Sequence, residues 1–160
     1  MAYTKADLKH DLVAMGLTGN ETILIHSSMK SIGPVEGGAD TVLDALMEFF
    51  AEGLLLLPTH TWRFINEENR VFDVRRSPCC VGILPELFRQ RRGGALAAPT
   101  HSMAAYGKGR AAYRGRRGLD ATPLPLPAAA TTGCGQPTAK CCCWGSPTPA
   151  TPLSIAWRRY

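Results

Sequence analysis

Residues 26–33 combine hydroxyl groups, a cation and a glycine directly after an apolar run. They read His-Ser-Ser-Met-Lys-Ser-Ile-Gly and follow Thr22–Ile25, which has the composition of a strand. A loop of this kind offers backbone N–H groups, hydroxyls and an ammonium group in a small space. Such groups bind phosphates and the polar arms of phosphate-bearing carriers. The segment therefore predicts a site for a ligand of that class.

Two further polar loops border apolar runs. Thr59–Trp62 comes directly after Leu54–Leu57, and Thr100–Ser102 precedes Met103–Tyr106. Loops at the carboxyl ends of parallel strands line the binding crevice of open α/β sheets. We therefore expect His26–Gly33 and Thr59–Trp62 to face one pocket.

The order of the helix and strand patterns predicts an α/β fold. Thr4 and Asp7 have the spacing of a capping box, so a helix is expected to begin at Thr4. Strands are expected at Thr22–His26, Leu54–Leu57 and Met103–Tyr106, with a helix from Asp40 or Thr41 onward and another over Gly82–Gln90. This alternation predicts a mixed or parallel sheet with helices on its faces. The continuously apolar strand Leu54–Leu57 is expected to be buried on both faces.

The chain changes character after about residue 120. Residues 121–160 have neither helix nor strand periodicity, and proline, which removes backbone donors, recurs between Pro123 and Pro152. We predict a folded part over 1–120 and a low-complexity, irregular tail over 121–160. The core would then lack strands, so Leu54–Leu57 is expected to have an unpaired side and the chain to be marginally stable and prone to aggregation.

The cysteines do not have the spacing of a metal site. Cys79 and Cys80 are adjacent, Cys141–Cys143 are consecutive, and Cys134 lies upstream. Zinc ligands are usually separated so that two of them can turn onto one ion, so no metal site is predicted. A serine nucleophile is not predicted either, because the Gly-x-Ser-x-Gly elbow is absent.

Charge and hydropathy narrow the class of protein. The net charge is +5, and a basic cluster over Lys108–Arg117 could attract a polyanion. Few aromatic residues interleave with it, so nucleic-acid binding is the less favoured interpretation. No apolar run reaches the length of a membrane span, and charged residues interrupt the first eleven positions. We therefore expect a cytoplasmic protein that does not enter a membrane.

The polar loops, in this order and spacing, resemble those of the aminoglycoside 3-N-acetyltransferase family, also called antibiotic N-acetyltransferases. The resemblance covers residues 4–110 and rests on 26–33, 35–42 (Val-Glu-Gly-Gly-Ala-Asp-Thr-Val), 58–62 (Pro-Thr-His-Thr-Trp), 72–73 (Phe-Asp) and 99–107 (Pro-Thr-His-Ser-Met-Ala-Ala-Tyr-Gly). It implies the family's α/β fold. It also implies a cytoplasmic enzyme of antibiotic resistance that transfers acetyl from acetyl-coenzyme A to the 3-amino group of an aminoglycoside.

The resemblance also implies site residues. Coenzyme A would be bound by Ser27, Ser28, Lys30, Ser31 and Gly33 in one loop and by Thr100, His101 and Ser102 in another. The aminoglycoside would lie toward Thr59, Thr61, Trp62 and Asp73. An attacking ammonium group must first lose a proton to a general base, and His101 is the candidate catalytic residue.

One motif of the family pattern is absent from residues 1–160. The family's principal base is a histidine in an Asn-Thr-x-x-His-like motif, and residues 1–160 contain no such motif. Read one base out of register, the codons for Cys141–Cys143 can encode Leu-Leu-Leu, and those for Ala150–Ser154 can encode an Asn-Thr-x-x-His match. We therefore hypothesise a shifted reading frame that begins near Ala121–Pro127, and we expect the chain as written to be impaired in catalysis.

Two other functions stay open on the sequence alone. One is a coenzyme A-binding fragment without chemistry, in which the loop over 26–33 still binds its ligand. The other is a small basic nucleic-acid-binding protein that uses residues 106–118. The oligomeric state and the drug spectrum are not predicted.

Overall fold

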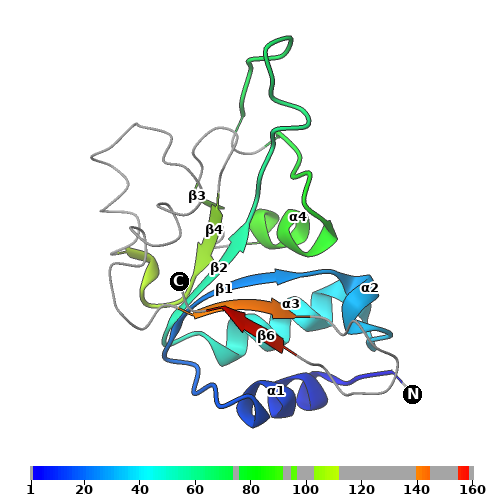
Figure 1. Ribbon diagram of the computed structural model, residues 1–160, viewed down its shortest axis with the longest axis vertical. Helices are drawn as coiled ribbons and strands as arrows, with labels where there is room; N and C mark the ends of the chain where they lie inside the picture. The colour runs from blue at the N-terminus through cyan, green and yellow to red at the C-terminus, as the bar shows by residue number, and fades with distance from the viewer. Residues whose placement is uncertain are drawn as a thin grey trace.

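A six-stranded sheet runs through the computed structural model, which describes residues 2–73, 76–91, 95–96, 103–111, 140–144 and 155–158. The strand order is β3-β4-β2-β1-β5-β6 (Figure 1). Near the centre, β1 (Thr22–Ser27) lies parallel to β2 (Leu54–Pro58) on one side and to β5 (Lys140–Trp144) on the other. Antiparallel pairs complete the sheet: β4 (Met103–Tyr106) with β2, β3 (Ala95–Leu96) with β4, and β6 (Ile155–Arg158) with β5. The mixed sheet predicted from the sequence is confirmed.

Three helices form an apolar layer on one face of this sheet. They are α1 (Lys5–Ala14), α3 (Gly38–Phe49) and α4 (Ile83–Gln90). Alternation along the two central strands directs one set of side chains into this layer: Ile23, Ile25, Leu55 and Leu57. Leu24, Leu54 and Leu56 lie on the other face and are also buried. The expected burial of the second strand on both faces is therefore confirmed. None of the described helices is long and apolar enough to cross a bilayer.

The predicted helix starts agree with the structure to within three residues. Thr4 caps α1: its hydroxyl accepts from the Asp7 N–H at 3.2 Å, and the Asp7 carboxylate accepts from the Thr4 N–H at 2.8 Å. The helix predicted from Asp40 or Thr41 begins earlier, at Gly38, because Gly37 adopts a left-handed conformation with φ 72° and turns the chain into it.

The loop expected after β1 is instead a single helical turn. This turn, α2 (Met29–Ile32), begins after Ser28, whose hydroxyl accepts from the Ser31 N–H. Ile32 is buried in the core and ties the turn to the helical layer. The local cap and the burial of one side chain together decide this conformation, and neither produces a recognisable period in the sequence.

The tail contributes two strands, although we expected none after residue 120. β5 and β6 fall in the two longest runs of the tail that contain neither proline nor glycine. β5 pairs along β1 from Ile23 to Ser27, where it satisfies main-chain groups that would otherwise lack partners. The rest of residues 112–160 lies outside the described part of the chain.

The expectation of an unpaired second strand was wrong. β2 pairs with β1 on one side, in the register Ile23 to Leu55, and with β4 on the other, in the register Leu57 to Ala104. β4 is an antiparallel neighbour of β2, so both sides of β2 are hydrogen-bonded to strands of this chain.

Ion pairs connect the three helices of the apolar layer. Lys5 and Lys9 on α1 both bind the Glu48 carboxylate on α3, with Lys5 Nζ at 2.7 Å. Arg91, just beyond α4, binds both Asp40 and Asp44 on α3. Hydrogen bonds from Lys5 and Lys9 lower the pKa of the Glu48 carboxyl to about 2. The three helices are therefore linked by charge as well as by apolar contact.

The Glu48 cluster predicts a pH-dependent contribution to stability. A carboxyl whose pKa is lower in the folded state stabilises the fold above its unfolded pKa of about 4.3, and this contribution is lost as the pH falls toward 2. Glu48→Gln should therefore lower the free energy of unfolding at pH 7, and the difference from wild type should shrink between pH 4.5 and pH 2. Urea unfolding at several pH values measures this difference.

Glu36→Gln is the matched control, because Glu36 is exposed and has no ion pair among the described residues. A constant difference between Glu48→Gln and wild type across this pH range would show that the pair does not stabilise the fold.

Candidate functional site

The end of β1 brings five of the predicted ligand-binding residues into one short segment. Ser27 closes the strand, Ser28 caps α2, and Lys30 and Ser31 lie within the turn, which Gly33 ends with φ 97°. The Ser28 and Ser31 hydroxyl oxygens lie 2.9 Å apart and share a hydrogen bond.

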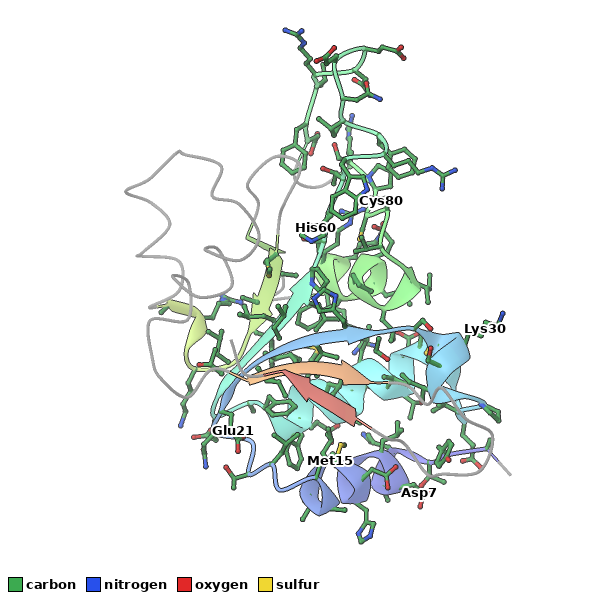
Figure 2. All side chains as sticks on the ribbon, viewed as in Figure 1. Asp7, Met15, Glu21, Lys30, His60 and Cys80 are labelled. Atoms are coloured by element: carbon green, nitrogen blue, oxygen red, sulfur yellow. The ribbon has the colours of Figure 1, made fainter. Side chains whose placement is uncertain are left out.

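Lys30 offers a cation at this end of the sheet. Its side chain is exposed and makes no ion pair among the described residues. Figure 2 shows it pointing away from the sheet beyond β1. An anionic group that approached this end of β1 would meet an ammonium group and two hydroxyls.

The end of β2 is buried and polar. Thr59, His60 and Thr61 are only 4%, 3% and 2% exposed, and the His60 ring stacks on Trp62 with 4.6 Å between the ring centroids. The Thr61 hydroxyl oxygen is buried and has no hydrogen-bond partner among the residues that the structure describes. An unpartnered buried hydroxyl costs free energy, so a ligand group that reached it would recover a hydrogen bond.

The two strand ends open at the same edge of the sheet. β1 and β2 run parallel and in register. Ser27, the last residue of β1, and Thr59, the residue directly after β2, therefore lie at the same edge of the sheet. Met103, where antiparallel β4 begins, pairs with Pro58 and therefore lies at this edge as well. The loops after β1 and β2 therefore leave the sheet at a shared edge, and that they face one pocket stays a prediction. Thr100, His101 and Ser102 lie outside the described residues, so their roles stay predictions as well.

Asp73 lies in a turn of the long loop that follows β2. This loop projects away from the sheet between β2 and α4 (Figure 1). The Asp73 carboxylate accepts from the Arg76 N–H at 3.2 Å, and the Asp73 carbonyl accepts from the Ser77 N–H at 2.8 Å. Asp73 thus stabilises the loop itself, a role that the sequence analysis did not predict.

A long-range contact holds the return of this loop against the end of β2. The Cys80 N–H donates to the His60 carbonyl at 2.8 Å, and the Cys79 N–H donates to the Glu86 carboxylate at 2.7 Å. Figure 2 shows His60 and Cys80 close together at the base of the loop. Sequence reasoning missed this support because residues 20 positions apart meet here with no pattern to signal it.

Glu86 on α4 is the anchor of this support. It accepts from the Arg89 guanidinium at 2.7 Å as well as from Cys79, and both side chains of the ion pair are largely buried. Burial would raise the pKa of the Glu86 carboxyl, but the hydrogen bonds from Arg89 and Cys79 outweigh it and hold that pKa below its usual value. The carboxylate therefore stays charged and fixes residues 79–81 beside the strand end.

Removing the Glu86 charge should destabilise the chain more than removing an exposed carboxylate does. Arg89 is only 8% exposed, so Glu86→Gln would remove a charged partner from a mostly buried guanidinium. We expect a loss of about 2 kcal/mol in the free energy of unfolding, and faster proteolysis of residues 62–80. Denaturant unfolding and limited proteolysis measure the two effects.

Glu52→Gln is the matched control, since it breaks a pair with Lys108 whose side chains are 60% and 70% exposed. It should cost less than about 1 kcal/mol. Equal losses in the two variants would contradict the anchoring role of Glu86.

Comparisons with known proteins identify the relatives of this chain. A sequence model described as Aminoglycoside 3-N-acetyltransferase matches residues 24–125. The SPbeta prophage-derived aminoglycoside N(3')-acetyltransferase-like protein YokD of Bacillus subtilis is 31% identical over an alignment of 130 positions that covers 66% of this chain and 47% of that protein. The chain spans about half the length of the curated relatives that it matches.

Solved structures share the fold. The apoenzyme of aminoglycoside acetyltransferase AAC(3)-IVa has a TM-score of 0.70 and is 25% identical, with 89% of this chain and 56% of that chain covered. AAC-IIIb, whose structure was determined as a binary complex with CoASH, has a TM-score of 0.66 at 23% identity and covers 89% of this chain and 59% of its own. Because the family model matches more than half of the 160 residues, across both strand-end loops of the shared edge, the chain belongs to the aminoglycoside 3-N-acetyltransferase family.

Proposed function

We propose that this chain carries the coenzyme A site of an aminoglycoside 3-N-acetyltransferase, and that its reaction transfers acetyl from acetyl-coenzyme A to the 3-amino group of the antibiotic. The observation that carries the proposal is the family match over residues 24–125, which includes the loops after both β1 and β2. Acetyl-coenzyme A is a cytoplasmic metabolite, so we assign the enzyme to the cytoplasm.

The end of β1 would bind the phosphate-bearing arm of coenzyme A. Phosphates need cations and donors, and Lys30 together with the hydroxyls of Ser27, Ser28 and Ser31 offers both. Gly33 lets the main chain approach a ligand closely. In this proposal, Thr100, His101 and Ser102 complete the coenzyme A site.

The end of β2 would face the aminoglycoside. The buried Thr61 hydroxyl can bind a sugar hydroxyl or amine, and Trp62, at 45% exposed, offers a ring face for the apolar side of a sugar. Thr59 and Asp73 belong to the same part of the proposed site. A drug with several ammonium groups would also be attracted to the Asp73 carboxylate.

Transfer would be direct, within a complex of both substrates. A base takes a proton from the 3-ammonium group, the free amine attacks the thioester carbonyl, and coenzyme A leaves as the thiol. Backbone N–H groups would stabilise the oxyanion that develops on the carbonyl. His101 is the proposed base, because hydroxyl side chains flank it in a loop that the proposal assigns to the coenzyme A site. Because the family motif for the principal base is absent, turnover by the chain as written should be slow.

Coenzyme A should stabilise the chain, and Lys30 should contribute to its binding. A ligand that binds only the folded state raises the free energy of unfolding by about 2.7 kcal/mol at about 100 times its Kd. Lys30→Gln should weaken coenzyme A binding about tenfold, the equivalent of about 1.4 kcal/mol for one lost charge-assisted contact. Thermal unfolding across a coenzyme A titration measures both effects.

Lys108→Gln is the matched control, because Lys108 is an exposed lysine next to β4, at the opposite edge of the sheet from Lys30. Thiol release from acetyl-coenzyme A in the presence of gentamicin measures turnover in the same samples. Binding without thiol release would assign the chain as a coenzyme A-binding fragment. Salt-sensitive retention of RNA with no response to coenzyme A would overturn the proposal in favour of nucleic-acid binding.

A further inference from the structure

The ring of His60 stacks on the ring of Trp62 just beyond the end of β2. The two ring centroids lie 4.6 Å apart, and the ring planes are inclined by 27°. This separation is at the short end of the range of about 4.5–7 Å in which aromatic pairs attract each other. The two partners differ in burial, because His60 is 3% exposed and Trp62 is 45% exposed. A buried ring therefore supports an accessible one.

The main chain of His60 is held by the return of the long loop. The Cys80 N–H donates to the His60 carbonyl at 2.8 Å, and the Cys80 sulfur lies 3.1 Å from the same oxygen. The neighbouring Cys79 N–H donates to the Glu86 carboxylate on α4. Figure 2 shows His60 and Cys80 together at the base of the loop. The support from Glu86 thus extends to the residue that carries the imidazole.

A tight turn holds the main chain of Trp62. The Thr61 carbonyl accepts from the Phe64 N–H and from the Ile65 N–H, each at 2.9 Å. Ile65 is 8% exposed, so burial of its side chain fixes the far end of this turn. With the main chain fixed, the indole can still move about its two side-chain torsions, and the stack with His60 restricts them. The indole is therefore oriented before a ligand arrives.

The residue between the two stacked rings also indicates a ligand of sugar chemistry. The Thr61 hydroxyl oxygen is buried and has no hydrogen-bond partner among the described residues. A sugar ring has an apolar C–H face, which packs on an aromatic ring, and polar substituents, which need hydrogen-bond partners. Residues 60–62 offer both kinds of contact within three positions.

We infer that His60 is a positioning residue for aminoglycoside binding, whose ring holds the Trp62 indole in the orientation that receives a sugar ring of the drug. His60 acts through Trp62, since so little of His60 itself is exposed. The inference rests on the proposed function, because it concerns the same substrate. An indole that is already oriented avoids the cost of immobilising a side chain on binding, which corresponds to about threefold to tenfold in affinity.

Calorimetric titration with gentamicin compares matched variants. His60→Leu fills the buried space without a flat ring, and it should weaken gentamicin binding about threefold to tenfold. His60→Phe restores a flat ring and should bind gentamicin as the unsubstituted chain does. His10→Ala is the control, because His10 is exposed on α1 and has no ring contact among the described residues. The affinity for coenzyme A should be the same in all of these chains.

A measurement on the unsubstituted chain avoids variants at position 60 that fail to fold. The NMR order parameter of the Trp62 indole N–H, without drug, should equal that of rigid backbone, about 0.85. Trp62→Phe identifies this signal among those of the three tryptophans. A value in the range of flexible segments, below about 0.6, would overturn the inference.

The binding data separate this inference from the proposed function. Equal gentamicin affinity in His60→Leu and the unsubstituted chain, or an equal loss in His60→Leu and His60→Phe, would overturn the inference alone. A matching loss of coenzyme A affinity in His60→Leu would show a general structural role and would overturn it as well. An unsubstituted chain that binds coenzyme A but not gentamicin would contradict the proposed drug substrate, and the inference would fail with it.

Discussion

The parallel pairing of β1 with β2 is the constraint on which the rest of this structure depends. Both strands are apolar and buried, so their register is set by two faces at once. At their amino ends the chain is packed tightly: a side chain on Gly53 would place its first carbon 2.4 Å from the Glu21 carbonyl oxygen. At their carboxyl ends, β1 continues into α2, and β2 continues into the loop that begins at Thr59. The edge to which we assign ligand binding is thus a direct consequence of one strand pair.

The sequence predicted those elements that depend on interactions between residues close together in the chain. The capping box of α1, the apolar run of β2 and the stripe of α4 were all readable, because each is specified by neighbours within a few positions. The turn α2 was not predicted, since it depends on the burial of Ile32 by distant helices. β5 was missed for a related reason: the unsatisfied edge of β1, and not the pattern of Lys140–Trp144, decides that a strand forms there.

The candidate site also has a part that the sequence predicted and a part that it did not. The loops after β1 and β2 were expected to face one pocket, and the parallel topology behind that prediction places them at one edge of the sheet. The support from Glu86 and the contact between Cys80 and His60 depend on the return of a long loop, which no spacing in the sequence reveals. The pairing of β5 uses main-chain groups and does not test the frame-shift hypothesis. That hypothesis stays a prediction, which sequencing the gene across the codons for Ala121–Pro127 would decide.

Hydrogen exchange read by mass spectrometry tests most directly whether the two strand ends act as one ligand site. Coenzyme A should slow exchange in peptides that cover Ser27–Gly33 and Thr59–Thr61 together, at one ligand concentration. Peptides over Phe50–Gly53, at the opposite edge of the sheet, should not change. Slowed exchange at the opposite edge alone, or no change at either strand end in the presence of saturating coenzyme A, would contradict the account.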